Sequence, residues 1–324
     1  MPLPGALSPM PLIWTLTDGK AGDVLQCLGV AEALVEMDGG TIEQQVIRPR
    51  SLYALTTPWG PADPADMRRM VPPYPAIVVA SGRRAVPPLR ALKRRSPRTF
   101  TVFLKNPRTG RGAADFIWVP AHDRLRGDNV LATLTSPHRL TPPTLAAARA
   151  WAPPELKALA SPRVAVLAGG PSKDVTFDEA DIGDFAAMVR ELAKSGAGLM
   201  ATPSRRTPGI LTEALQDALG HRGFLWNGEG HNPYAAMLAL ADAIVVTADS
   251  VNMLGEAAAT GKPVHVFMPK GVPPKVQRFI DGLIEHGAVV KFTGSLENFT
   301  YTPLDSTPLI AQEIMQRFRR FLER

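Results

Sequence analysis

Residues 243–264 read AIVVTADSVNMLGEAAATGKPV, and this stretch decides the fold. The apolar run 243–247 is rich in β-branched residues and predicts a buried strand, which leads into a polar Thr-Ala-Asp-Ser segment. The pattern over 251–260 predicts a helix that begins directly after this segment, and a Gly-Lys-Pro turn leads into the next apolar run, 264–267. A strand, a helix and a strand in close succession are typical of a parallel sheet with helices on both faces.

The same alternation runs through the whole chain in two series. In the first, strands are predicted at 12–17, 41–47, 76–80, 99–104, 116–119 and 130–134, and helices at 24–37 and 86–95. In the second, strands are predicted at 164–168, 198–202, 223–226, 243–247, 264–267 and 288–292, and helices at 182–194, 210–219, 233–240, 251–260, 275–286 and 309–322. Two such series predict an α/β protein with two Rossmann-like, doubly wound domains that face a cleft. A Pro-rich segment separates them, so we expect an N-terminal domain at 1–145 and a C-terminal domain at 146–324.

Length and composition exclude several classes of protein. A chain of 324 residues is long enough for two domains, and a hydrophobic content of 45% is too high for intrinsic disorder. Cys27 is the single cysteine, so no disulfide framework and no cysteine-based zinc site can form. No uncharged apolar run approaches the ~20 residues that span a bilayer, and the N-terminus lacks the basic residues of a signal peptide. We therefore expect a cytoplasmic protein.

Charge is distributed unevenly along the chain. Residues 1–160 hold 20 basic and 12 acidic side chains (net +8), and residues 161–324 hold 16 basic and 18 acidic ones (net −2). Ten cations and no carboxylate lie between Arg83 and Arg111. Such a cluster attracts phosphates, although it also suits a solvated helix face. Because no nucleic-acid-binding motif appears, we expect an anionic membrane surface at the inner leaflet or a lipid-linked acceptor, and no nucleic acid.

Several catalytic signatures are missing from the sequence. No G-x-G-x-x-G follows a strand, and neither H-E-x-x-H nor G-x-S-x-G occurs. No two aspartates are separated by one residue, as they are in the metal–diphosphate site of the other major glycosyltransferase fold. The six histidines have no spacing that suggests a metal site. We therefore expect no metal and no bound cofactor.

Two loops of the N-terminal half carry candidate acceptor-side residues. The segment after the first strand holds Gly19 and Gly22, whose amides can approach a ligand, with Lys20 as a phosphate contact and Asp18 as a general base. The alternative is a tight turn with Asp23 as the helix N-cap. Arg83 and Arg84 follow another strand end and are further acceptor-side candidates. His122, next to Asp123, is a second catalytic candidate, although a lone histidine is more often structural.

Three loops of the C-terminal half suit a nucleotide and its phosphates. Each follows a predicted strand and combines glycines, hydroxyls, arginines or a helix N-terminus, which all favour anions, although a polar turn or a helix cap would have the same composition. The candidates are Gly169, Gly170, Ser172, Lys173, Ser204, Arg205, Arg206, Thr247, Asp249, Ser250, Val251, Asn252 and Glu256. Glu256 lies on the helix after Ser250, where its carboxylate can accept hydrogen bonds from two vicinal ribose hydroxyls. Trp226 with Tyr234 can border a nucleobase pocket or belong to the core.

These loops, in this order, resemble the family of plant "elongated mitochondria" fission factors and their bacterial relatives. The resemblance covers about residues 12 to 300. Its segments are Thr17–Gly22 with Gln26, Ala80–Arg84, Asn106–Arg108, Val119–Leu125 with Asn129-Val130, Gly169–Lys173, Ser204–Pro208, Leu225-Trp226, Asn232–Tyr234 and Val246–Val264. It implies a GT-B-like pair of Rossmann-type domains, with the last helix packed back on the N-terminal domain. The segment from Ser250 to Pro263 also resembles the donor-site helix of GT-B glycosyltransferases, where the helix N-terminus holds a diphosphate and the Glu holds a ribose.

We predict a metal-independent, GT-B-type glycosyltransferase that uses a nucleoside-diphosphate sugar and an anionic or lipid-linked acceptor. A non-hydrolysing nucleotide-sugar epimerase can use the same fold. A non-catalytic binding or scaffold protein is the alternative that the role of the plant relatives in organelle fission suggests. The base and the sugar are not specified by the sequence, because backbone groups often contact the base edges.

Overall fold

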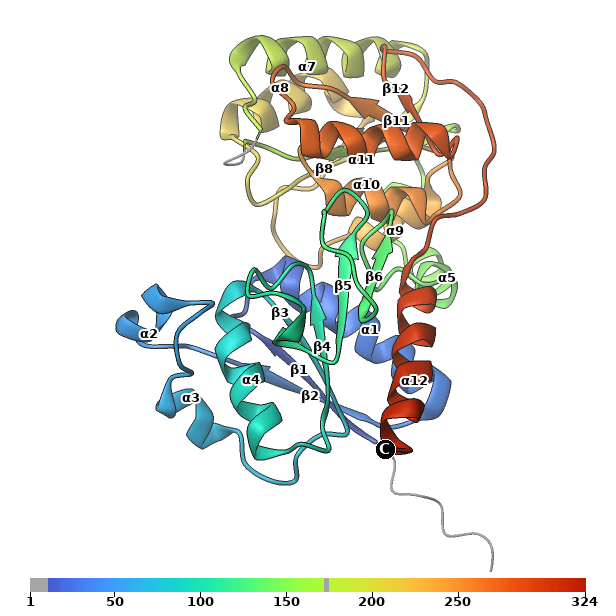
Figure 1. Ribbon diagram of the computed structural model, residues 1–324. Helices are drawn as coiled ribbons and strands as arrows, with labels where there is room; N and C mark the ends of the chain where they lie inside the picture. Colours follow the sequence, from blue (N-terminus) through green and yellow to red (C-terminus); the bar gives the residue numbers. More distant parts are fainter. Residues whose placement is uncertain (1–10, 172–174) are drawn as a thin grey trace, which may run out of the picture. The chain divides into compact units, whose positions relative to one another are not determined.

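The computed structural model describes residues 11–171 and 175–324, and its residue contacts divide the chain into two units (Figure 1). The N-terminal unit takes the described part of Met1–Arg139 together with Ser306–Arg324, and the C-terminal unit takes the described part of Leu140–Asp305. The C-terminal unit is therefore inserted between two stretches of the N-terminal unit. In the described part of the chain, no helix is long and apolar enough to span a membrane.

The N-terminal unit is built on a parallel sheet of six strands in the order β2-β1-β3-β4-β5-β6. The strands are β1 (Leu12–Thr17), β2 (Thr41–Val46), β3 (Ile77–Ser81), β4 (Phe100–Leu104), β5 (Phe116–Pro120) and β6 (Val130–Thr133). The helices are α1 (Ala21–Asp38), α2 (Ser51–Thr56), α3 (Pro64–Arg69), α4 (Val86–Arg95) and α12 (Thr307–Leu322), with short 3-10 turns η1 (Arg83–Ala85) and η2 (Arg111–Ala113).

Helices cover both faces of this sheet, because successive residues of its apolar strands point to opposite sides (Figure 1). On one face α1 and α12 pack against the strands through a cluster that includes Ile13, Val79, Val102, Val30, Leu34, Ile314 and Phe318. On the other face α3 and α4 pack through a cluster that includes Trp14, Val78, Phe103, Met67, Leu89 and Leu92. The last helix of the chain therefore belongs to the core of the N-terminal unit.

The C-terminal unit repeats this architecture with the strand order β12-β11-β10-β7-β8-β9, again all parallel. Its strands are β7 (Arg163–Ala168), β8 (Gly198–Pro203), β9 (Phe224–Leu225), β10 (Ala243–Thr247), β11 (Val264–Phe267) and β12 (Val289–Lys291). Its main helices are α7 (Glu179–Lys194), α8 (Gly209–Leu219), α9 (Tyr234–Leu240), α10 (Val251–Ala258) and α11 (Pro274–Glu285), with a 3-10 turn η3 (Gly220–Arg222). Helices α7 and α8 pack on one face, where Phe185, Val189 and Leu215 are fully buried.

The Pro-rich segment between the two predicted domains is not an irregular linker. It contains two helices, α5 (Pro142–Ala150) and α6 (Pro154–Lys157), and the contact boundary falls at Arg139–Leu140. Each helix has a proline in its first turn, where the missing N–H group is no loss. Helix α5 packs against α9, and Arg149 donates a hydrogen bond to the carbonyl of Ala239. The sequence analysis missed these helices because it took the prolines as breakers.

The strand orders place one topological switch point in each unit. In the N-terminal unit the chain moves from β1 outward to β2 and then returns to β3 on the other side of β1. In the C-terminal unit the corresponding pair is β7 and β10. Loops diverge there at the carboxyl ends of the strands, which leaves a crevice where open α/β sheets bind ligands. The candidate residues of the four loops after β1, β3, β7 and β10 therefore lie at these two points.

Candidate nucleotide-sugar and acceptor sites

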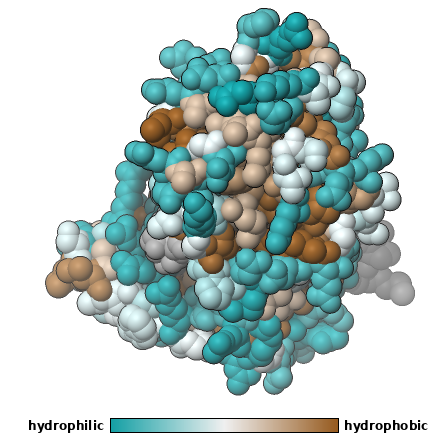
Figure 2. All heavy atoms as spheres, turned by 90° about the horizontal axis from the view of Figure 1, so that it is seen from above, coloured by the Kyte–Doolittle hydropathy of each residue, from teal (hydrophilic) through white to brown (hydrophobic). Residues whose placement is uncertain are grey.

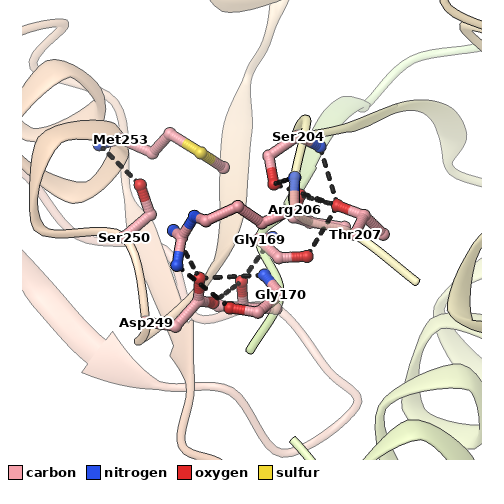
Figure 3. Close-up of polar contacts among 10 residues, drawn as sticks. Gly169, Gly170, Ser204, Arg206, Thr207, Asp249, Ser250 and Met253 are labelled. Carbon is pink, nitrogen blue, oxygen red and sulfur yellow. Dashed lines mark hydrogen bonds and ion pairs between the residues drawn. The ribbon is translucent and has the colours of Figure 1, made fainter. Parts of the chain in front are cut away.

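Asp249 is the centre of the polar cluster at the switch point of the C-terminal unit (Figure 3). Its side chain is fully buried, and its Oδ2 accepts hydrogen bonds from the amide of Gly170 at 2.9 Å and from the Arg206 guanidinium at 3.0 Å. Its Oδ1 accepts one from the hydroxyl of Thr247 at 2.7 Å, and that hydroxyl oxygen accepts one from the amide of Gly169 at 2.7 Å. A buried carboxylate with a cation and three hydrogen bonds is fully compensated. Asp249 therefore fixes the loops after β7, β8 and β10 to one another.

Gly169 and Gly170, which follow β7, lie so close to neighbouring atoms that neither position has room for a side chain. A Cβ atom on Gly169 would lie 2.1 Å from Asp249 Oδ2, and a Cβ on Gly170 would lie 2.2 Å from the carbonyl oxygen of Arg206. Both amides donate within the cluster, so they hold Asp249 and Thr247 and do not point freely at a ligand. Ser172 and Lys173, the other candidates of this loop, lie outside the described residues.

Arg206 is the cation that the cluster positions. One of its terminal nitrogens donates to Asp249 and the other to the carbonyl of Gly170 at 3.2 Å, while its side chain remains 41% exposed. A guanidinium has five N–H donors in a fixed fork, so donors remain for an anion. Arg205 is exposed and has no ion pair within residues 11–171 and 175–324. Ser204 and Thr207 hold the turn, because the Ser204 amide donates to Thr207 Oγ1 at 2.8 Å, and that hydroxyl donates to the Gly169 carbonyl at 2.6 Å.

The N-terminus of α10 opens at the same point. Ser250 is its N-cap, with Oγ accepting a long hydrogen bond of 3.4 Å from the amide of Met253 (Figure 3). Val251 is half-buried and Asn252 is exposed in the first turn. The unpaired amides of a helix N-terminus and its dipole favour an anion. Arg206 and this helix end therefore offer two independent sources of positive potential in one unit.

Glu256 lies in the second turn of α10 and is half-buried. The hydroxyl of Tyr234, from α9, donates to its Oε2 at 2.5 Å. Burial raises the pKa of Glu256 from 4.5 to about 7, although the bond from Tyr234 acts in the opposite direction. Burial and the neighbouring carboxylate raise the pKa of the Tyr234 phenol as well. Sequence analysis considered Tyr234 as a border of a base pocket or as part of the core, and the chain spacing between Tyr234 and Glu256 gave no signal of this bond.

The switch point of the N-terminal unit brings together several acceptor-side candidates. The Asp18 side chain is only 2% exposed, with Lys20 Nζ at 3.1 Å and Arg84 at 3.8 Å from its Oδ2. Gly19 is exposed with φ +82°, a left-handed conformation that favours glycine, and Gly22 lies in the first turn of α1. Arg83 is exposed on η1. The side chains of Asp18, Lys20 and Arg84 therefore form one charged cluster.

A second, buried carboxylate lies beside this cluster and was missed. Asp23 Oδ1 accepts hydrogen bonds from Ser81 at 2.7 Å and from the ammonium of Lys105 at 2.6 Å. The sequence analysis gave Asp23 only the role of an N-cap, but the N-cap of α1 is Lys20. Lys105 has φ +79°, which is rare for a residue with a side chain and is a feature of functional sites. The three residues are far apart in the sequence, so a contact between them could not be seen there.

His122, the other catalytic candidate, is half-buried in the loop after β5. Its neighbour Asp123 has a structural role. The Asp123 Oδ1 atom accepts hydrogen bonds from the Asn106 side chain at 3.2 Å and from the Leu125 amide at 3.0 Å, which tie the loops after β4 and β5 together. Asp123 therefore joins these two loops, and the catalytic role of His122 stays a prediction.

Comparison with solved structures identifies the fold. A UDP-GlcNAc 2-epimerase from Methanocaldococcus jannaschii is similar over 95% of this chain and 100% of its own, with a TM-score of 0.58 and 12% sequence identity. The Neisseria meningitidis UDP-GlcNAc 2-epimerase bound to UDP-GlcNAc has a TM-score of 0.56 at 14% identity, again over 95% and 100% of the two chains. CalG4, the calicheamicin glycosyltransferase, has a TM-score of 0.50 at 14% identity over 98% and 94%. At such identities the likeness establishes the GT-B-like fold and no activity.

Comparison of sequences identifies the family. The Arabidopsis thaliana mitochondrial fission protein ELM1 is 32% identical over 272 residues, which are 74% of this chain and 63% of that protein. An uncharacterized protein of Rickettsia prowazekii is 32% identical over 163 residues, 46% of this chain and 45% of its own length. The chain thus spans less than two thirds of the length of these curated relatives. The model of the family "Mitochondrial fission ELM1" matches residues 21–318. The chain therefore belongs to the mitochondrial fission ELM1 family.

Proposed function

We propose that the chain is a metal-independent glycosyltransferase whose C-terminal unit binds a nucleoside-diphosphate sugar. The observation that carries the proposal is the buried Asp249 carboxylate, which holds the Arg206 guanidinium at a sheet switch point beside the N-terminus of α10. Structural neighbours whose ligand is a nucleotide sugar, such as the Neisseria epimerase, support this choice of ligand.

The diphosphate would lie between Arg206 and the first turn of α10. Arg206 would contact one phosphate with its free N–H groups, and the Ser250 hydroxyl with the amide of Val251 would contact the other. In this metal-independent proposal, the Arg206 guanidinium and the dipole of α10 would provide the charge that stabilises the departing diphosphate.

The ribose and the acceptor have separate candidates. Glu256, ionised, would accept hydrogen bonds from the two ribose hydroxyls, in competition with its bond from Tyr234. A pocket of about 330 Å³ in the same unit is lined by Trp226, Asn227 and Pro233 and would take the base. In the N-terminal unit, Asp18 would act as the general base for the acceptor hydroxyl. Its carboxylate lies among cations, and its two oxygens accept no hydrogen bond from the described residues.

Arg206→Ala is expected to weaken nucleotide binding by about 10- to 100-fold, the range for loss of a charge-assisted hydrogen bond. Isothermal titration with UDP, GDP, ADP, CMP and dTDP first identifies the base, and the variants are then compared with the best ligand. Arg205→Ala should lose much less affinity, because none of the described carboxylates pairs with that side chain. Arg222→Ala removes an exposed arginine of η3 and is the matched control. Equal losses in the Arg206 and Arg222 variants would contradict the proposal.

The reaction itself is tested with the donor alone. A glycosyltransferase leaves the sugar of the donor unchanged or releases it slowly, whereas an epimerase changes its stereochemistry, which NMR detects directly. If none of the nucleotides binds, the chain acts as a binding or scaffold protein, in keeping with a family of fission factors.

We also propose that the N-terminal unit docks on an anionic membrane surface. The exposed cations of the α2–α4 side of the unit include Arg48, Arg50, Arg68, Arg69, Arg94, Arg95 and Arg98. On the same side, the α2 segment presents Leu52, Leu55 and Trp59, which are 73%, 82% and 66% exposed, and apolar side chains gather at that margin in Figure 2. The sequence does not single out this segment, because α2 is a helix of six residues without an amphipathic period. Apolar side chains with arginines around them suit insertion at an anionic interface.

Charge reversal of Arg94 and Arg98 is expected to reduce binding to anionic vesicles, because each cation near such a surface contributes on the order of 1 kcal/mol. Lys93 and Arg95 are left unchanged, since Lys93 bonds to Asp115 at 2.8 Å and Arg95 to the Met67 carbonyl at 2.7 Å. Co-sedimentation with and without phosphatidylglycerol, at low and high salt, measures the effect. Charge reversal of Arg190, exposed on α7, is the control. Binding that ignores salt and charge reversal would contradict the proposal.

A further inference from the structure

We infer that the N-terminal unit has a ligand site of its own, which takes a phosphate ester that carries a free hydroxyl group close to its phosphate. The site lies at the switch point between β1 and β3, where the loops after the two strands bring Asp18 and Arg84 together. Only the role of the compound, as the sugar acceptor, rests on the proposed function. The binding itself stands on the geometry of the cluster.

The first observation is an incomplete carboxylate. The Asp18 side chain is 2% exposed, yet within the described residues neither of its oxygens accepts a hydrogen bond. Lys20 compensates its charge only in part, because the Lys20 side chain is 64% exposed and the nearby Arg84 guanidinium is 3.8 Å away. A buried carboxylate is stable when its lone pairs are used. Ligand hydroxyls close to Asp18 would provide the missing donors.

Asp23 is the neighbouring carboxylate, and unlike Asp18 it accepts hydrogen bonds within the unit. Asp23 has both a hydroxyl donor, Ser81, and an ammonium donor, Lys105. Gly82, with φ +90°, lies between the two carboxylates, since a Cβ atom there would be 3.2 Å from Asp23 Oδ2 and 3.6 Å from Asp18 Oδ1. Gly82 therefore lies between one carboxylate that accepts hydrogen bonds and one that accepts none from the described residues.

The second observation is an excess of positive charge around these two anions. Lys20, Arg84 and Lys105 outnumber Asp18 and Asp23, and Lys20 and Arg84 keep part of their surface open. Helix α1 also begins here without a side-chain cap, so its first amides and its dipole add to the positive potential. An anion is expected to bind these groups, whereas a neutral polyol would leave them unused.

The two observations together select the ligand class. A free phosphate would use the cations but would be repelled by Asp18 and would give it few donors. A phosphate ester with a neighbouring hydroxyl places its phosphate on Arg84, Lys20 and the α1 amides while its hydroxyl donates to Asp18. Two sources have this chemistry. One is a soluble sugar or polyol phosphate, and the other is the headgroup of phosphatidylglycerol.

Calorimetry on the full chain tests the site with glycerol 3-phosphate, inorganic phosphate and glycerol. We expect glycerol 3-phosphate to bind about tenfold or more tightly than inorganic phosphate, as one hydrogen bond to a charged group provides. Arg84→Ala should weaken both anions about tenfold or more, and Asp18→Asn should remove the preference for the ester. Arg320→Ala, which removes an exposed arginine of α12 in the same unit outside the cluster, should change neither.

Short-chain phosphatidylglycerol below its micelle concentration distinguishes the two sources of the ester. Binding of either the lipid or the soluble ester, with this dependence on Arg84 and Asp18, supports the inference and names the source. Equal affinity for ester and inorganic phosphate, or indifference to both variants, overturns it. The nucleotide titration is run on the same preparations. Nucleotide binding without ester binding overturns only the present inference, and ester binding without nucleotide binding leaves this site intact and contradicts the proposed function.

Discussion

The Asp249→Ala chain is expected to lose about 3 kcal/mol of unfolding free energy and its affinity for nucleotides at once. The substitution leaves the buried Gly170 amide and Thr247 hydroxyl without their acceptor, and each such group costs about 1–3 kcal/mol. It also releases the Arg206 guanidinium, because Asp249 is the only described carboxylate that forms an ion pair with Arg206. Urea unfolding followed by circular dichroism measures the first effect, and calorimetry with the best nucleotide measures the second.

Asp249→Asn is the matched control for this experiment. It keeps the volume of the side chain and one acceptor oxygen for Gly170 and Arg206, so we expect a stability loss of about 1 kcal/mol. The loss of charge should nevertheless weaken nucleotide binding, because the guanidinium is then held less firmly. A loss of stability in Asp249→Ala within the range of ordinary surface substitutions, about 0.5 kcal/mol, would show that the cluster does not hold the loops together.

The affinity for a nucleotide sugar is expected to rise steeply with pH, on the order of 50-fold between about pH 5 and about pH 8. In the free chain burial raises the pKa of Glu256 to about 7, so most of this carboxyl is protonated in mild acid. Only the carboxylate can accept hydrogen bonds from both ribose hydroxyls, so binding releases the proton. A nucleoside-diphosphate sugar is used as the ligand, because its phosphates are esterified and do not titrate in this range.

Glu256→Gln removes the titrating group and should flatten this profile while it lowers the affinity at pH 8. The same pKa shift predicts a stability change without ligand. Since the pKa of the folded chain is the higher one, the contribution of the proton to stability is complete below about pH 4.5 and is lost as the pH rises towards 7. The wild-type chain should therefore lose stability relative to Glu256→Gln across that window. A pH-independent affinity of the wild-type chain would exclude Glu256 from the ribose site.

Most of the fold was predictable from the sequence, because burial on both faces of a parallel sheet leaves uninterrupted apolar runs. The predicted strand at 12–17 coincides with β1, and the predicted helix at 86–95 coincides with α4. The missed helices α2, α3, α5 and α6 are short and begin near prolines or lack a buried face. Their signal lies in caps and tertiary contacts. Asp63, for example, caps α3 and accepts three hydrogen bonds from Arg50, one from its amide and two from its guanidinium.

The candidate sites were predictable only at the level of loops. The motif around Asp249 indicated a polar segment at a strand end, but its carboxylate was grouped with phosphate contacts, whereas the structure buries it as the anchor of Arg206. The partners of Asp249 come from loops about 40 and 80 residues away in the chain, and local patterns contain no information on such distances. The same reason explains why Asp23, Ser81 and Lys105 were not grouped.

The insertion of one unit into the other has a consequence for synthesis on the ribosome. Thr307 exchanges hydrogen bonds with the backbone of His138 at 3.0 and 3.2 Å, so the chain leaves and re-enters the N-terminal unit at one point. The strands of that unit leave the ribosome first, but the apolar sheet face that contains Phe100 stays uncovered until Ile314 and Phe318 of α12 have been synthesised. The C-terminal unit can complete its core before the earlier one does. Until α12 has been translated, the nascent N-terminal sheet exposes an aggregation-prone apolar surface that a chaperone would have to cover.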